Sequence, residues 1–67
     1  MSEVKYPNIS VQLIGVDSNA FSVLGVVAQA LKRGGVDREE VLAFRKEAMS
    51  GDYDHLLATC AAWVSLG

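Results

Sequence analysis

Apolar and polar side chains alternate between Ile9 and Gly15, near the N-terminal end of the chain. Ile9, Val11 and Leu13 would face one way, and the intervening Ser10 and Gln12 the other. A period of two is typical of a β-strand with one buried face. Ile14 breaks the alternation, so this end of the strand is predicted to be covered on both sides. Residues 1–8 precede the pattern and are predicted to be a flexible polar lead-in.

The next apolar segment, residues 20–33, repeats at helical spacing. Its two adjacent apolar stripes are Phe21, Leu24, Ala28 and Leu31, and Ala20, Val23, Val27 and Ala30. A helix that is apolar nearly all round must be buried nearly all round, and two further helices of so short a chain cannot cover it. The pattern therefore predicts a subunit interface, with wholly intramolecular packing as the alternative. Gly25 costs about 1 kcal/mol relative to alanine inside a helix, which a close backbone contact would explain.

A second helix is predicted between two glycine-containing breaks, Gly34-Gly35 and Ser50-Gly51. Asp37 is the expected cap, Glu40 completes a capping box, and Val36 is placed to contact Val41 across the cap. The expected core face consists of Val41, Leu42, Phe44 and Ala48. The charged face is expected to be solvated and consists of Arg38, Glu39, Arg45, Lys46 and Glu47.

A third helix is predicted from Asp52 as cap through residues 53–62. Its expected inward side chains are Leu56, Leu57, Cys60 and Ala61. Residues 63–66 either continue this helix or form a short strand. Because a lone strand is not stable, the N-terminal strand needs a partner from this tail or from another subunit. The expected fold is α+β and mostly helical, with a strand, three helices and possibly a short C-terminal strand in one domain of residues 1–67.

Composition sharpens the expectation of self-association. A core in a chain of 67 residues rarely supplies more than roughly 3–5 kcal/mol without an added constraint. One cysteine excludes an intrachain disulfide, and one histidine excludes a Cys/His zinc site within one chain. The remaining means of stabilisation is a homo-oligomer, for which a dimer and a tetramer both remain open.

Charge and hydropathy restrict the partners and the location. The net charge is −2 and the six basic residues are scattered, which argues against nucleic acid as a partner. No apolar run has the length of a membrane span and no signal peptide opens the chain. The single free cysteine suits a reducing compartment, so a soluble cytoplasmic protein is expected.

Candidate chemistry is sparse, and we expect no enzyme, cofactor or metal. His55 lies beside Asp52 and Asp54, but neighbouring residues on a helix point about 100° apart. Cys60 is expected to be a small core residue. Anion binding at the two helix starts, Asp17-Ser18-Asn19 and Ser50-Gly51-Asp52, competes with plain helix capping. Of the nearby aromatic residues, Phe21 is expected in the core, whereas Tyr53 is the better candidate for exposure and for stacking on a base.

Two motifs resemble a family of very small proteins from bacteriophages and mobile elements. The first is Asp17-Ser18-Asn19-Ala20-Phe21, and the second runs without interruption from Ser50 to Leu57 as Ser-Gly-Asp-Tyr-Asp-His-Leu-Leu. With a closing Trp63-Val64, the resemblance covers Val11 to Val64. The chain departs from the family pattern at Ser18, where glycine is usual, and serine allows the loop less backbone freedom.

The resemblance implies a function and a set of site residues. Some members of the family are anti-defence proteins that assemble as oligomers and sequester the cyclic nucleotide signals of bacterial CBASS immunity without cleaving them. Carried over, this implies ligand pockets between subunits, with a cyclic dinucleotide as the ligand. The residues that would line them are Asn19, Phe21, Ser50, Tyr53 and His55, with Arg45 or Arg33 for phosphate contact. The alternative is a small protein-binding module that presents an apolar helical face to a host protein.

Overall fold

The computed structural model describes residues 4–15 and 17–66. The order of elements is β1 (Tyr6–Val11), α1 (Ala20–Arg33), α2 (Arg38–Ala48), α3 (Tyr53–Trp63) and β2 (Val64–Leu66). The α+β, mostly helical fold expected from the sequence is confirmed. Residues 1–3 of the predicted lead-in and Val16 of the predicted turn lie outside the described residues.

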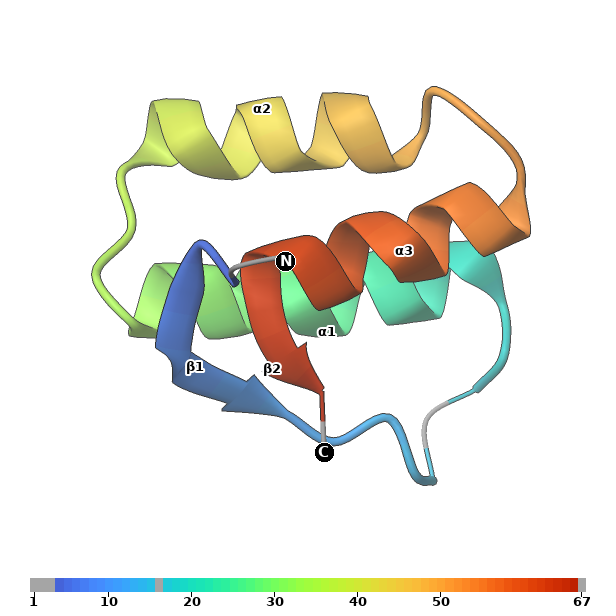
Figure 1. Ribbon diagram of the computed structural model, residues 1–67, viewed down its shortest axis with the longest axis horizontal. Helices are drawn as coiled ribbons and strands as arrows, with labels where there is room; N and C mark the ends of the chain where they lie inside the picture. The colour runs from blue at the N-terminus through green and yellow to red at the C-terminus, as the bar shows by residue number, and fades with distance from the viewer. Residues whose placement is uncertain (1–3, 16, 67) are drawn as a thin grey trace.

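The two strands pair with each other in parallel and form a two-stranded sheet. The three helices lie between them in the chain, so residues from its two ends meet (Figure 1). The tail therefore becomes a strand and supplies the partner that β1 needs. The register is Tyr6 opposite Val64 and Ser10 opposite Ser65, with an irregularity between. Pro7 falls within this irregularity, where its missing N–H disturbs no regular ladder.

The strand boundaries differ from those expected. The strand β1 starts at Tyr6 rather than Ile9, so residues 6–8 of the predicted lead-in are strand, and it ends at Val11 rather than Gly15. Ile14 lies in a turn and is 87% exposed, not covered on both sides. Pairing with β2 decides these boundaries, because Tyr6 lies opposite Val64 and Val11 opposite Leu66, the first and last residues of β2.

The start of β1 is held by a cluster of aromatic and charged side chains. The ring of Trp63 lies 5.4 Å from that of Phe44 and 5.9 Å from that of Tyr6. The ammonium group of Lys5 lies 4.2 Å from the Trp63 ring and 2.7 Å from Glu40 Oε1, and Tyr6 donates a hydrogen bond of 3.1 Å to the same oxygen. Hydrogen bonds from Lys5 and Tyr6 lower the pKa of Glu40, and the bond to Glu40 raises the pKa of Lys5.

This cluster replaces the predicted capping box of α2. Asp37 is the N-cap, but its side chain makes no capping hydrogen bond. Glu40 does not reach back to the start of its own helix, because its carboxylate binds Lys5 and Tyr6 of the N-terminal segment. A charged partner distant in sequence has thus displaced the local one.

The core lies where the three helices and the sheet meet. Its buried apolar side chains are Val11, Val23, Leu24, Val27, Ala28, Leu31, Val41, Phe44, Ala48, Leu56, Cys60 and Val64. Three predicted core positions are wrong: Phe21 is 69% exposed, Leu42 is 53% exposed, and Ala61 is exposed while Thr59 is buried in its place. Thr59 donates its hydroxyl hydrogen to the carbonyl of His55 at 2.8 Å, which satisfies the buried oxygen.

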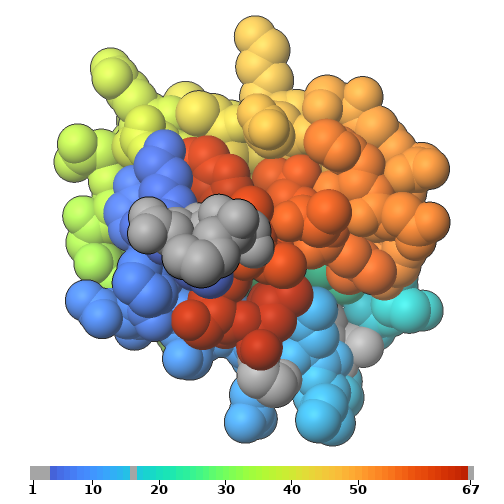
Figure 2. Space-filling model, viewed as in Figure 1, coloured from blue at the N-terminus to red at the C-terminus, as the bar shows by residue number. Residues whose placement is uncertain are grey.

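The helices surround the core on different sides. Figure 2 shows the face that carries β1, β2 and α3, and little of α1 is visible from this side. The helices α1 and α2 are joined by a short turn in which Gly35 has a φ of +85°, a conformation that glycine adopts without strain. None of the described helices is long and apolar enough to cross a membrane.

Candidate functional site

The residues of the two motifs lie at the starts of α1 and α3, at the same end of the molecule (Figure 1). Asn19 is the N-cap of α1, and its side-chain oxygen accepts a hydrogen bond from the Phe21 N–H at 2.8 Å. Asp17 in turn accepts from the Asn19 N–H at 3.2 Å. Asp52 caps α3 and accepts from the His55 N–H at 2.9 Å. The carboxylate and amide oxygens at these positions thus satisfy helix termini.

Side chains of the second motif stabilise the turn between α2 and α3 through hydrogen bonds. His55 Nε2 lies 3.0 Å from the carbonyl oxygen of Glu47 and 3.1 Å from Ser50 Oγ. The Ser50 hydroxyl donates to the same carbonyl at 2.6 Å. The imidazole packs so closely over Gly51 that a Cβ there would lie 2.7 Å from His55 Cγ. The structure therefore brings Ser50 and His55 together, and the glycine between them makes room for the ring.

The other three predicted site residues are exposed but dispersed. Phe21 is 69% and Tyr53 39% exposed, in the first turns of α1 and α3. Arg45 lies on α2 and borders a shallow groove between α1 and α2 of about 290 Å³. Its other lining residues are Gly25, Ala28, Gln29 and Lys32. The sequence-based site is therefore not gathered into one pocket within a single chain.

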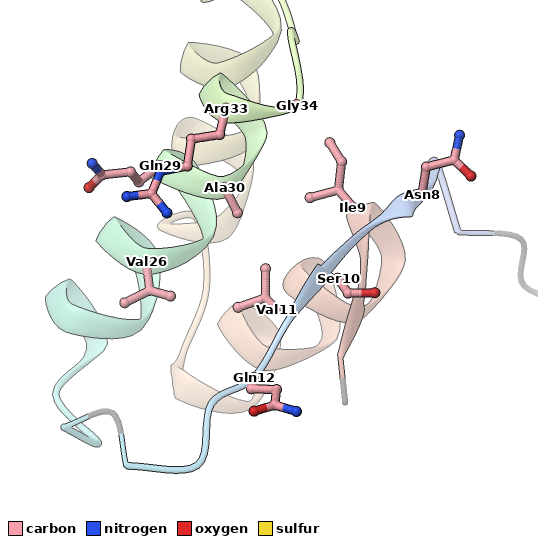
Figure 3. A pocket seen from close by; sticks show the side chains of 10 residues that line it. All are labelled: Asn8, Ile9, Ser10, Val11, Gln12, Val26, Gln29, Ala30, Arg33 and Gly34. Carbon is pink, nitrogen blue, oxygen red and sulfur yellow. The ribbon is translucent and has the colours of Figure 1, made fainter.

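A larger groove of about 570 Å³ runs between β1 and α1 (Figure 3). Its lining residues are Asn8, Ile9, Ser10, Val11, Gln12, Val26, Gln29, Ala30, Arg33 and Gly34. Ile9 and Val11 point toward α1, and Arg33 bends back along the helix toward Gln29. Small-molecule sites commonly occupy about 300–1,000 Å³, so this groove has the size of such a site and the α1–α2 groove lies at the lower limit.

The β1–α1 groove combines an apolar floor with groups that can make hydrogen bonds. Asn8, Gln12 and Gln29 carry amides, and Arg33 carries a guanidinium that makes no ion pair with any residue that the structure describes. One edge of β1 is paired with β2, and no other described strand pairs with its second edge. The free backbone N–H and C=O groups of that edge could form hydrogen bonds with a flat polar ligand, as they would with a neighbouring strand.

Sequence reasoning found Arg33 as a possible phosphate contact but missed the rest of this groove. The two walls are separated by the whole turn between β1 and α1, and their polar residues do not form a motif. The signal that could have found them is the set of polar side chains, Gln12, Gln29 and Arg33, that flank otherwise apolar elements.

Cys60 lies in the core, as expected from the sequence. Burial raises the pKa of its thiol to about 11. At neutral pH the sulfur is therefore protonated, and the thiol lacks the charge that makes cysteine nucleophilic. In residues 4–15 and 17–66, no group of three or more His, Cys, Asp or Glu side chains is placed to hold a metal ion.

Comparison with protein-family models finds no match, and comparisons with curated proteins and with solved structures find none either.

Proposed function

We propose that this chain is a non-catalytic, phage-encoded anti-defence protein that sequesters a cyclic dinucleotide immune signal and acts as a homo-oligomer. The β1–α1 groove is the structural observation that supports this proposal best. The resemblance of the Asp17–Phe21 and Ser50–Leu57 motifs to the family of small phage proteins supplies the ligand class.

The chemistry of the groove fits a nucleotide in three respects. The guanidinium of Arg33 is the natural contact for a phosphate, because its fork of N–H donors matches phosphate oxygens. The amides of Gln12 and Gln29 offer both donors and acceptors to the edge of a base. Ile9 and Val26 provide apolar surface for the faces of a base or sugar.

The test is native mass spectrometry of the purified protein, alone and with a panel of cyclic dinucleotides. We expect whole ligand masses to be added to a discrete oligomer and the ligand to be recovered intact after denaturation. Recovery of a cleaved product would contradict sequestration. Failure of the whole panel to bind, with no thermal shift at high ligand concentration, would contradict the proposal itself.

Two variants distinguish the groove from the motif residues as the place of binding. Arg33→Glu should weaken binding roughly 10- to 100-fold, the effect expected for a lost charged hydrogen bond. Lys46→Glu, an equal change of charge on the exposed face of α2, is the matched control. If instead Tyr53→Ala abolishes binding while Arg33→Glu does not, the ligand is held at the starts of α1 and α3 and the groove assignment is wrong.

The second candidate function is a protein-binding module, and exposed apolar side chains on α1 and α2 favour it. Phe21, Leu42 and Met49 are all about half exposed or more, and such a patch commonly marks an interaction site. This candidate predicts that the protein ignores nucleotides and binds one host protein through this surface. Loss of that complex on Leu42→Gln, with the fold retained by circular dichroism, would support it.

A further inference from the structure

One face formed by α1 and α2 carries several apolar side chains that the single chain leaves exposed, although Ala28 within it is buried. On α1, residues 21, 25, 28 and 32 follow one another at spacings of three and four and so share one side of the helix. On α2 and its C-cap, Leu42, Arg45 and Met49 share the adjoining side by the same spacing. We call these seven residues the α1–α2 face. Phe21, Leu42 and Met49 are its exposed apolar side chains, and Lys32 and Arg45 are its cations.

Gly25, in the middle of this face, has no explanation within the chain. A Cβ at this position would meet no atom within 4 Å outside its own stretch of helix. The contrast with Gly34 and Gly51 is plain, since a Cβ there would lie 2.5 Å from Ile9 and 2.7 Å from His55. Glycine weakens a helix, so the open space beside Gly25 points to a contact that another molecule makes.

The face is complementary to itself in shape. It carries a protruding ring, Phe21, and about one helical turn away the groove of about 290 Å³ whose lining includes Gly25, Ala28 and Gln29. When two copies of α1 cross antiparallel with Gly25 at the crossing, the residue four positions before Gly25 in one copy lies opposite the residue four positions after it in the other. Phe21 then meets Gln29 and the groove of the second copy, and the reverse contact follows from the two-fold symmetry.

The face is also complementary to itself in charge. Asp17 lies exposed just before α1, and Lys32 lies in its last turn. The same antiparallel crossing places Asp17 of one copy near the last turn of α1 in the other, which carries both Lys32 and Arg33. The phenyl ring of Phe21 would lie beside Lys32 and Arg45, which line the groove, and cations are attracted to the face of an aromatic ring.

We propose that a second copy of this chain covers the α1–α2 face, with the two α1 helices crossing antiparallel at Gly25 and each Phe21 seated in the groove of the other copy. The arrangement leaves Ile9, Val11 and Arg33 of the β1–α1 groove uncovered, whereas Gln29 lines both grooves and would be contacted by Phe21 of the second copy. It rests on the self-association that the proposed function includes, and it is tested without nucleotide.

The test is sedimentation velocity over a dilution series, with circular dichroism as the check on folding. The wild-type chain should be a dimer or a larger even oligomer. The Cβ of Gly25→Leu meets no atom within one chain, but the side chain blocks the close crossing, so it should weaken the dimer about 30-fold or more, as loss of a central contact does. Ala58→Leu adds a bulky side chain to an exposed position of α3 and should leave the dimer unchanged. If Gly25→Leu disturbs the fold, the exposed-site variant Leu42→Gln/Met49→Gln gives the same test.

A charge exchange tests the antiparallel pairing. Asp17→Lys and Lys32→Asp should each weaken the dimer roughly 2- to 5-fold, as expected for an exposed ion pair. The double variant should restore it, because both pairs are rebuilt with reversed signs. No restoration would contradict the antiparallel crossing.

Other outcomes overturn the interface altogether. A monomeric wild-type chain would do so, as would an oligomer indifferent to Gly25→Leu and Leu42→Gln. An intact dimer that binds no cyclic dinucleotide would contradict the proposed ligand and leave the interface standing. Nucleotide binding by a monomer would contradict the interface and leave the proposed ligand standing.

Discussion

Two glycines, one in the middle of α1 and one directly after it, are used in opposite ways. Gly34, directly after α1, lies under the Ile9 side chain, and a Cβ there would come within 2.5 Å of it. Gly25, in the middle of α1, has open space where its side chain would be. The flank of α1 that faces β1 is therefore closed by the chain itself at Gly34, and the flank that adjoins α2 is left open at Gly25. Gly34 is therefore required by the fold of the single chain, whereas Gly25 has no role within it.

The largest effect should come from a third position of the closed kind, Gly51. Gly51→Ala places a methyl group 2.7–2.9 Å from the Cβ and ring atoms of His55, which lie too close to the helix backbone to move aside. We expect a loss of about 2–3 kcal/mol in the free energy of unfolding, at the upper end for overpacking, measured by urea denaturation. A chain as stable as the wild type would show that the imidazole does not pack over the turn.

Gly34→Ala should cost less, about 1–2 kcal/mol by the same measurement. The nearest atoms are Cδ1 and Cγ1 of Ile9, at 2.5 and 2.8 Å, and the outer atom of a flexible side chain can move. Ile9→Val removes Cδ1, so the double variant should recover part of the loss. If the losses in the free energy of unfolding from Gly34→Ala and Ile9→Val simply add in the double variant, the contact between these two positions is contradicted.

Gly25→Ala should raise the stability of the monomeric chain, whereas the two preceding substitutions lower it. Alanine favours a helix by up to about 1 kcal/mol over glycine, and no clash opposes it within the chain. Under conditions that keep the protein monomeric, thermal unfolding should therefore shift upward. A downward shift would mean that the space beside Gly25 is filled in the folded monomer.

The smallest effect concerns pH and the charged cluster at the start of β1. Lys5 and Tyr6 lower the pKa of Glu40 in the folded chain below its ordinary value of 4.5. The resulting stabilisation is fully present above that ordinary value and is lost as the pH falls through the lowered one. Glu40→Gln should therefore narrow the difference between urea midpoints at neutral and acidic pH. Glu39→Gln, at the exposed neighbouring position, should leave that difference unchanged.

Local sequence patterns were enough to predict the kinds of elements and their order along the chain. The period of two near Ile9, the apolar stripes of residues 20–33 and the breaks at Gly34 and Ser50 predicted a strand and three helices, and α1 has the predicted bounds. Asn19, Asp37 and Asp52 were correctly placed at helix starts. These features are local, since periodicity and capping depend on residues within a few positions of one another.

Features that depend on residues far apart in the chain could be seen only in the folded molecule. The pairing of Tyr6 with Val64 fixed where β1 starts. Glu40 forms an ion pair with Lys5 and does not cap its own helix. The exposure of Phe21 and Leu42 followed from how α1 and α2 turn toward the core, which an apolar pattern broader than the available core does not specify. The β1–α1 groove likewise exists only because Ile9 and Val11 are laid beside Val26 and Ala30. Periodicity marks which residues avoid water, but the three-dimensional path of the chain decides which of them the fold can cover.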